Sequence, residues 1–275
     1  MSMLERVSLS QCNAQQRLTS HRGRRTEQGG NHMATFLLIH GAWHGGWCWK
    51  KVTPLLREAS HQVFTPTLTG VGERSHLAHP LIGLETHVRD VVNVLTYEDL
   101  RGVILVGHSN GGTLITAVAE RVPERLAHLV YLDAFVPQDG QATIDLTNFP
   151  REAWEARVRT EGYGWLVPSL QPVPWDEFLR DVWGVSDEAD RRWMVERLGP
   201  TPFKIFIDPV RRTNPAAEAL PRTYIRCLQN HSPAFDRFAE AARTTPGWRY
   251  RELTTGHDAM VTAPQEVAGL LLELT

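Results

Sequence analysis

The chain has 275 residues, of which 42% are hydrophobic and 22% are charged, and its formal net charge is −2. This composition can bury a large core and argues against disorder over most of the chain. The near balance of charge excludes the basic footprint expected of a nucleic-acid or anionic-membrane binder, and no apolar run approaches the ~18 residues of a membrane span.

The cysteines and the N-terminal residues indicate in which cellular compartment the protein is expected. Cys12, Cys48 and Cys227 are an odd number without a CxxC pair, which favours free thiols and a reducing environment. Residues 1–33 are polar and lack the apolar core of a secretory signal, so we expect a flexible extension ahead of the domain. These features predict a cytoplasmic protein, and they leave a homodimer open.

From Thr35 onward, apolar runs alternate with amphipathic segments, the pattern of a parallel sheet covered by helices. Gly102–Gly107 is short, apolar and rich in β-branched residues, as a central strand is. Residues 84–97 carry apolar side chains at helical spacing. The predicted strands are 35–40, 62–66, 102–107, 126–132, 222–227 and 248–253, and the predicted helices are 54–59, 84–97, 110–121, 188–198, 233–242 and 264–274.

The alternation breaks in residues 137–221, which contain many prolines and short helical patches. We predict that this segment is a helical cap inserted after the strand that ends near Asp133, on a core formed by residues 34–136 and 222–275. Ligand pockets of open α/β sheets form outside the carboxyl ends of the strands, where such a cap would lie. A helical excursion whose tryptophans only pack is the alternative. These are Trp154, Trp165, Trp175, Trp183 and Trp193.

Ser109 is the predicted nucleophile. It lies in the motif Gly107-His108-Ser109-Asn110-Gly111, between a buried strand and a helix, as a nucleophile elbow requires. The two glycines would remove side chains that clash at this sharp turn. The helix that follows would direct N–H groups at developing negative charge. A phosphate-binding loop is the alternative, but the Gly-Lys-Ser/Thr ending of that motif is missing.

A serine hydroxyl needs a base, and His257 is predicted to supply it because it follows the last strand and precedes the last helix. The oxyanion hole would consist of the backbone N–H groups of Asn110 and Ala42. His40 and His44 are four residues apart on a loop without an acidic third ligand, so no metal site is predicted.

The segments HGAWHGGWCWKKVTPLL, TPTLTGVGERSH, GHSNGG and GHDAM resemble the hydroxynitrile lyase and plant methylesterase branch of the α/β-hydrolases, from about Thr35 to the C-terminus. The resemblance implies an α/β-hydrolase fold and a cofactor-free Ser-His-Asp enzyme that acts on small esters or cyanohydrins. The lyases of this branch carry Thr directly after the first His and Lys directly after the catalytic His. Gly41 and Asp258 stand there in this chain, which favours ester hydrolysis because an aspartate would repel departing cyanide.

The resemblance also implies an acid just after strand 222–227, but this chain reads Cys227-Leu228-Gln229-Asn230-His231 there. Other α/β-hydrolases supply the acid from the neighbouring strand end, which here carries Asp133. We therefore predict Asp133 as the acid, with Asp236 and Asp208 as weaker candidates and Asn230 as a neutral alternative.

The preferred hypothesis is a serine esterase that cleaves a small aromatic or apolar ester. The predicted substrate contacts are His40, Gly41, Trp43, Phe135 and Trp165, and Asn110 would add a hydrogen-bonding group beside the nucleophile. A lactone or carbamate-type bond is an alternative substrate. A ligand-binding receptor with vestigial activity is another alternative, favoured only by the missing acid.

Overall fold

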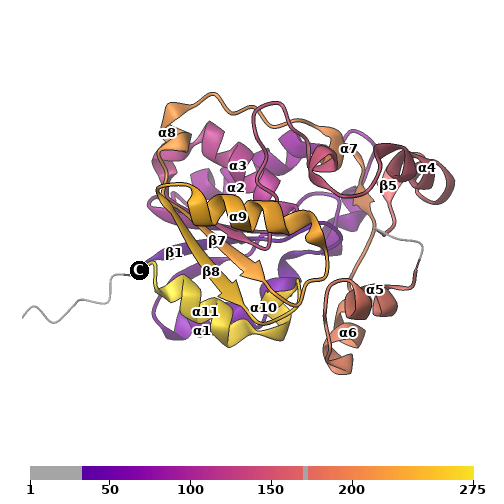
Figure 1. Cartoon of the computed structure of the whole chain (residues 1–275). Coiled ribbons are helices and arrows are strands. Elements are labelled where there is room, and N and C mark those ends of the chain that lie inside the picture. Colours follow the sequence, from indigo (N-terminus) through magenta and orange to yellow (C-terminus); the bar gives the residue numbers. More distant parts are fainter. Residues whose placement is uncertain (1–32, 170–172) are drawn as a thin grey trace, which may run out of the picture. The chain divides into compact units, whose positions relative to one another are not determined.

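The computed structural model describes residues 33–169 and 173–275 (Figure 1). The predicted extension, residues 1–33, lies outside the described residues except for Met33. Within the described residues, six strands form one sheet, and every paired neighbour in it is parallel. In spatial order the strands are β2 (Gln62–Phe64), β1 (Thr35–Ile39), β3 (Val103–His108), β4 (Leu126–Leu132), β7 (Arg222–Cys227) and β8 (Trp248–Leu253).

Helices cover both faces of this sheet (Figure 1). On one face α1 (Val52–Glu58) packs against α11 (Pro264–Leu272), next to the short α10 (Ala259–Thr262). On the other face lie α2 (Leu84–Tyr97), α3 (Gly111–Arg121) and α9 (Asp236–Thr244). Each face has its own apolar cluster, so the central strands of the sheet are buried on both sides.

The strong sequence signals correspond to the central elements. All six residues of β3 are buried, as expected of a parallel strand with helices on both sides. On α2, Val88, Val91 and Leu95 are buried along one face, which the helical spacing predicted. The predicted sheet flanked by helices is therefore confirmed.

Residues 137–221, between β4 and β7, form short helices joined by irregular segments where they are described. They contain α4 (Arg151–Glu161), α5 (Trp175–Asp181), α6 (Glu188–Val195), α7 (Lys204–Ile207) and α8 (Pro215–Glu218). They also contain an antiparallel pair, β5 (Leu166–Val167) and β6 (Thr201–Pro202), which the sequence did not predict. Trp43 ties this segment to the loop after β1, because its backbone N–H donates to Thr201 Oγ1 and its indole N–H donates to the Val167 carbonyl.

Single-turn elements account for one wrong boundary. The helix predicted over 233–242 begins as a 3-10 turn at Pro233, and α9 starts at Asp236 and runs to Thr244.

Cys48 and Cys227 are buried and free. None of the helices in the described part of the chain is long and apolar enough to cross a membrane. The 3-10 turns are η1 (Gly46–Trp49), η2 (Gly72–Leu77), η3 (Pro123–Arg125), η4 (Thr143–Leu146) and η5 (Pro233–Phe235).

Candidate active site

Ser109 occupies a strained turn between β3 and α3. Its φ is +54°, in the left-handed region that a non-glycine residue rarely adopts. The turn is held by the neighbouring strand end: Ser109 N–H donates to the Leu132 carbonyl at 3.2 Å, and the Ser109 carbonyl accepts from Phe135 N–H at 3.1 Å. The conformation expected of a nucleophile elbow is thus present, and β4 supports it.

The glycines of the motif permit this close packing. A Cβ on Gly107 would lie 2.5 Å from the Gly111 carbonyl oxygen, and one on Gly111 would lie 2.9 Å from the His40 carbonyl oxygen. A Cβ on Gly41 would lie 2.8 Å from the Ser109 Cβ. Larger residues at these positions would displace backbone or the serine itself.

Asp133 and His257 meet behind Ser109. Asp133 ends β4 with a φ of +43°, which an aspartate tolerates better than most residues. Its Oδ2 lies 2.7 Å from His257 Nδ1, and both side chains are buried. This contact holds the imidazole with Nδ1–H toward the carboxylate and leaves Nε2 as the nitrogen that can accept a proton.

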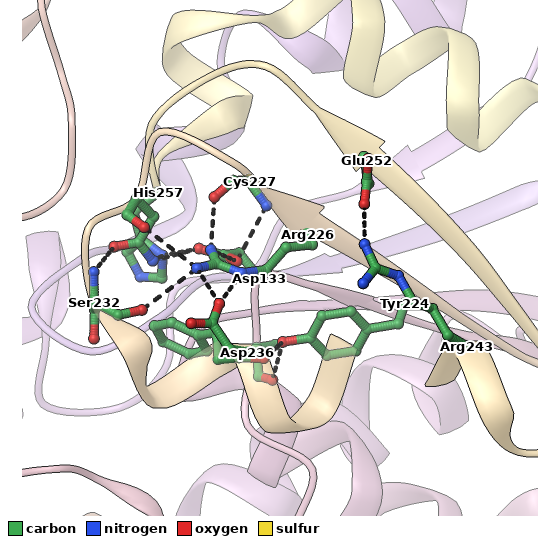
Figure 2. Close-up of polar contacts among 12 residues, drawn as sticks. Asp133, Tyr224, Arg226, Cys227, Ser232, Asp236, Arg243, Glu252 and His257 are labelled. Atoms are coloured by element: carbon green, nitrogen blue, oxygen red, sulfur yellow. Dashed lines mark hydrogen bonds and ion pairs between the residues drawn. The ribbon is translucent and has the colours of Figure 1, made fainter. Parts of the chain in front are cut away.

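The Asp133 carboxylate has three further donors. The Arg226 guanidinium donates to Oδ1 at 2.8 Å, Cys227 N–H donates to the same oxygen at 3.2 Å, and Asn230 Nδ2 donates to Oδ2 at 2.6 Å. Figure 2 shows Arg226 between Asp133 and Asp236, which approaches from α9. Burial alone would lower the pKa of Arg226, but Asp133 and Asp236 outweigh it and raise that pKa.

The loop that carries His257 is fixed through its backbone. His257 N–H donates to the Trp183 carbonyl at 2.7 Å, and His108 Nε2–H donates to the His257 carbonyl at 3.1 Å. Burial lowers the pKa of His108 well below its ordinary value, so His108 is a neutral donor. Within the described residues no hydrogen bond joins Ser109 to His257, although both line one pocket.

The two residues predicted to supply the oxyanion hole lie at this pocket. Ala42 and Asn110 both line it, and neither N–H has a hydrogen-bond acceptor in residues 33–169 and 173–275. His40 orients the first amide. Because its Nε2 accepts from Leu68 N–H, Nδ1 carries the proton and donates to the Gly41 carbonyl, which directs the Ala42 N–H the opposite way across the trans peptide. Burial lowers the pKa of His40 to about 3, consistent with this neutral tautomer.

The pocket has a volume of about 360 Å³, and seven of its twenty described lining residues are Trp or Phe. Trp43 and Phe135 contribute to it, as predicted from the sequence. The segment between β4 and β7 and the loop after β7 supply further aromatic side chains that were not singled out for this role. These are Phe149, Trp154, Trp183, Phe206 and Phe235.

Three residues predicted to contact substrate do not line this pocket. His40 and Gly41 lie beneath it, where His40 orients the loop and Gly41 packs against Ser109. Trp165 is half-buried beside β5, and its carbonyl accepts from Phe203 N–H. The many tryptophans indicated an aromatic lining, but without a regular period in this segment they could not indicate which rings face inward.

The other acid candidates lie elsewhere. Asp236 pairs with Arg226, and Asp208 pairs with Lys204 and accepts from Leu84 N–H at the start of α2. Asn230 Nδ2 lies 3.2 Å from His257 Nδ1 and donates to Asp133, so Asn230 supports the carboxylate. Arg226 was missed, although an arginine within a buried strand is a signal for a buried partner.

Asp258 does not line the pocket, so the expectation that its charge would repel departing cyanide was wrong. It is fully buried, and its Oδ1 lies 3.0 Å from His44 Nε2. Burial alone would raise the pKa of Asp258, but the attraction of His44 lowers it below its ordinary value. His44 Nδ1–H in turn donates to the Ala42 carbonyl at 2.7 Å.

Among the described residues no group of three or more His, Cys, Asp or Glu side chains could hold a metal ion.

Comparisons with known proteins identify the family and the fold. A family model described as "Alpha/beta hydrolase family" matches residues 36–270. A carbendazim-hydrolysing esterase of Nocardioides sp. (strain SG-4G) is 39% identical, over 88% of this chain and 100% of its own. Methylesterase 1 of Arabidopsis thaliana is 27% identical, over 87% of this chain and 95% of its own.

Among solved structures, an extracellular α/β-hydrolase from a Paenibacillus species superposes with a TM-score of 0.75. It is 24% identical, and the match covers 88% of this chain and 98% of that one. This likeness supports the fold.

Proposed function

Because the chain belongs to the α/β-hydrolase family, and its relatives are named as esterases, we propose that it is a carboxylic ester hydrolase with Ser109 as nucleophile, His257 as base and Asp133 as acid. The observation that carries the proposal is the 2.7 Å contact between Asp133 Oδ2 and His257 Nδ1, in a pocket that Ser109 also lines.

The reaction would proceed through an acyl-enzyme. Ser109 Oγ attacks the carbonyl carbon while His257 Nε2 takes its proton, and the carbonyl oxygen becomes negative between the Ala42 and Asn110 amides. His257 then protonates the departing alcohol. Water, deprotonated by the same nitrogen, attacks the acyl carbon and releases the acid and Ser109. Asp133 stabilises the imidazolium in both halves of the cycle.

The pocket supports a small substrate with an aromatic or apolar group. About 360 Å³ accommodates a ring-sized acyl or alcohol part, and Trp154, Phe206 and Phe135 offer apolar faces to it. The described lining contains no Lys or Arg, so no permanently charged side chain is there to accept departing cyanide. This lining disfavours a hydroxynitrile lyase more directly than the charge of Asp258 does, because Asp258 does not line the pocket.

A carbamate-type bond is the second candidate. The relative at 39% identity is named for hydrolysing carbendazim, an aromatic methyl carbamate, and Ser-His-Asp chemistry can cleave a carbamate as it cleaves an ester. The receptor hypothesis depended on a missing acid, and Asp133 supplies one.

Labelling and turnover test this proposal. We expect a fluorophosphonate to label Ser109, and p-nitrophenyl acetate to give a burst of p-nitrophenol that Ser109→Ala abolishes. Ser75→Ala, at an exposed position on η2, is the matched control and should behave as the wild type. An unlabelled Ser109 in the folded protein would refute the enzyme. Parallel assays of methyl benzoate and carbendazim separate the two substrate classes.

A further inference from the structure

Asn110 carries a side-chain amide that the proposed acyl transfer does not use, since only its backbone N–H belongs to the oxyanion hole. The residue directly follows Ser109, and it lines the pocket although it is only 8% exposed. Consecutive Cα atoms lie about 3.8 Å apart, so the Asn110 side chain enters the pocket close to Ser109.

Two buried threonines fix the orientation of this amide. Thr143 Oγ1 donates to Asn110 Oδ1 at 2.7 Å, and Thr143 Oγ1 lies 2.8 Å from Thr113 Oγ1. Because the single hydroxyl proton of Thr143 is used on Asn110, the proton between the two threonines must come from Thr113. Both threonines are 0% exposed and belong to α3 and η4. The carbonyl end of the amide therefore already has a hydrogen-bond partner within the protein.

The other end of the amide is free. Asn110 Nδ2 has no hydrogen-bond partner in the described part of the chain, while the rings of Phe135, Phe149 and Trp154 line the same pocket. A donor among apolar groups is costly to leave unpaired once water is displaced. A substrate that offers an acceptor at this point would regain the bond.

We propose that Asn110 selects substrates that carry an additional hydrogen-bond acceptor two bonds from the scissile carbonyl carbon, such as a pyridine-type nitrogen or a second carbonyl oxygen. The inference rests on the proposed hydrolase and narrows its substrate class. The amide presents only N–H groups to the pocket, so a donor at the same place on the substrate gains nothing.

Two isomeric esters test the inference with the wild-type enzyme. Methyl picolinate has its ring nitrogen next to the ester-bearing carbon, whereas methyl isonicotinate has it across the ring. After each kcat/KM is divided by the rate constant for hydroxide-catalysed hydrolysis, we expect the picolinate to be favoured about tenfold, the value of one good hydrogen bond.

Variants then assign the preference to the amide. Asn110→Leu keeps the backbone N–H and a similar volume, and it should reduce the normalised ratio to about one. Thr143→Val leaves Asn110 in place but free to turn, and the ratio should fall part of the way. Thr147→Val is the matched control, because Thr147 lines the same pocket but donates to the Ile144 carbonyl, and it should keep the wild-type ratio.

A wild-type ratio near one, a preference for the isonicotinate, or a preference that Asn110→Leu leaves intact would overturn the inference. Circular dichroism checks that each variant is folded. If Asn110→Leu is unfolded, the ratio measured for Thr143→Val decides the test. If neither ester is hydrolysed while a fluorophosphonate still labels Ser109, the two isomers are compared as competitors of labelling, with the same expected ratio. If Ser109 is unreactive, the proposed function fails first and the inference falls with it.

Discussion

Two fully buried carboxylates flank His257, and they differ in how they are paired. Asp133 receives hydrogen bonds from Arg226, Cys227 N–H and Asn230 as well as from His257. Asp258 lies at an ion-pair distance from His44, but neither of its oxygens meets hydrogen-bond geometry with any described residue.

This difference separates two uses of a buried charge. The donors around Asp133 fix both of its oxygens, so it can hold one tautomer of His257 and respond to the positive charge that develops there. Asp258 instead links the loop after β8 to the loop after β1, through His44 and the Ala42 carbonyl. Burial beside a histidine does not by itself distinguish the two carboxylates, whereas the set of donors does.

The largest expected effect is on turnover at the first carboxylate. Asp133→Asn should lower kcat about 10²–10⁴-fold, because an amide cannot hold His257 in the required tautomer or stabilise the imidazolium. Asparagine tolerates the left-handed backbone at this position, so folding should survive. Steady-state kinetics with p-nitrophenyl acetate measures the loss, and an unchanged kcat would remove Asp133 from the triad.

A swap of the two side chains sharpens this assignment. Asn230 Nδ2 lies 3.2 Å from His257 Nδ1, so an aspartate there could accept the hydrogen bond that Asp133 accepts from His257 in the wild type. We expect Asp133→Asn/Asn230→Asp to recover at least about tenfold of the kcat that the single Asp133 variant loses. Asn230→Ala in the same background is the control and should recover nothing. A double variant no faster than Asp133→Asn would show that position 230 cannot serve His257.

The second carboxylate should affect stability more than turnover. Asp258→Asn removes one partner of a buried pair and should lower the free energy of unfolding by about 3 kcal/mol at pH 7, with kcat falling less than tenfold. Chemical denaturation and steady-state kinetics measure the two effects. A loss of kcat as large as that of Asp133→Asn would contradict the distinction between the two carboxylates.

The sign of the pH dependence follows from the pKa of Asp258, which is lowered from the ordinary value of 3.8. The unfolded chain therefore binds this proton more readily, so the stabilisation is complete above pH 3.8 and is lost as pH falls through the lower, folded pKa. The gap between wild type and Asp258→Asn should narrow below about pH 4 in thermal melts. A gap that stays constant down to pH 3 would exclude the ionised Asp258 carboxylate as its source.

The sequence predicted the parts of the molecule that depend on local pattern. Helix α2 and strands β4, β7 and β8 begin and end where apolar spacing placed them. The prediction of Ser109 as nucleophile came from a motif at a strand end. The predictions of Asp133 as acid and His257 as base came from their positions after β4 and β8. That the contact between the last two is found at 2.7 Å fits the rule that carboxyl ends of parallel strands meet at one edge.

What could not be predicted depends on contacts distant in sequence. The β5–β6 pair has only two residues a strand, too short to leave a period, and it includes Pro202. The pairing of Asp258 with His44 joins residues 214 positions apart, and no local feature of the Gly256-His257-Asp258 run indicates it. The side chains of Asn110, Thr113 and Thr143, next to Ser109, likewise meet only after η4 folds back over α3.

The smallest expected effect distinguishes the two carboxylates that share Arg226. Asp236 pairs with the same guanidinium as Asp133, but its side chain is 66% exposed, so solvent screens the pair and its contribution is small. Asp236→Asn should leave kcat within about twofold of the wild type, because Asp133 still holds Arg226 from the buried side. The same p-nitrophenyl acetate assay provides the measurement. A tenfold loss would instead mean that Arg226 depends on Asp236 for its orientation, and the set of donors around Asp133 would then extend to the protein surface.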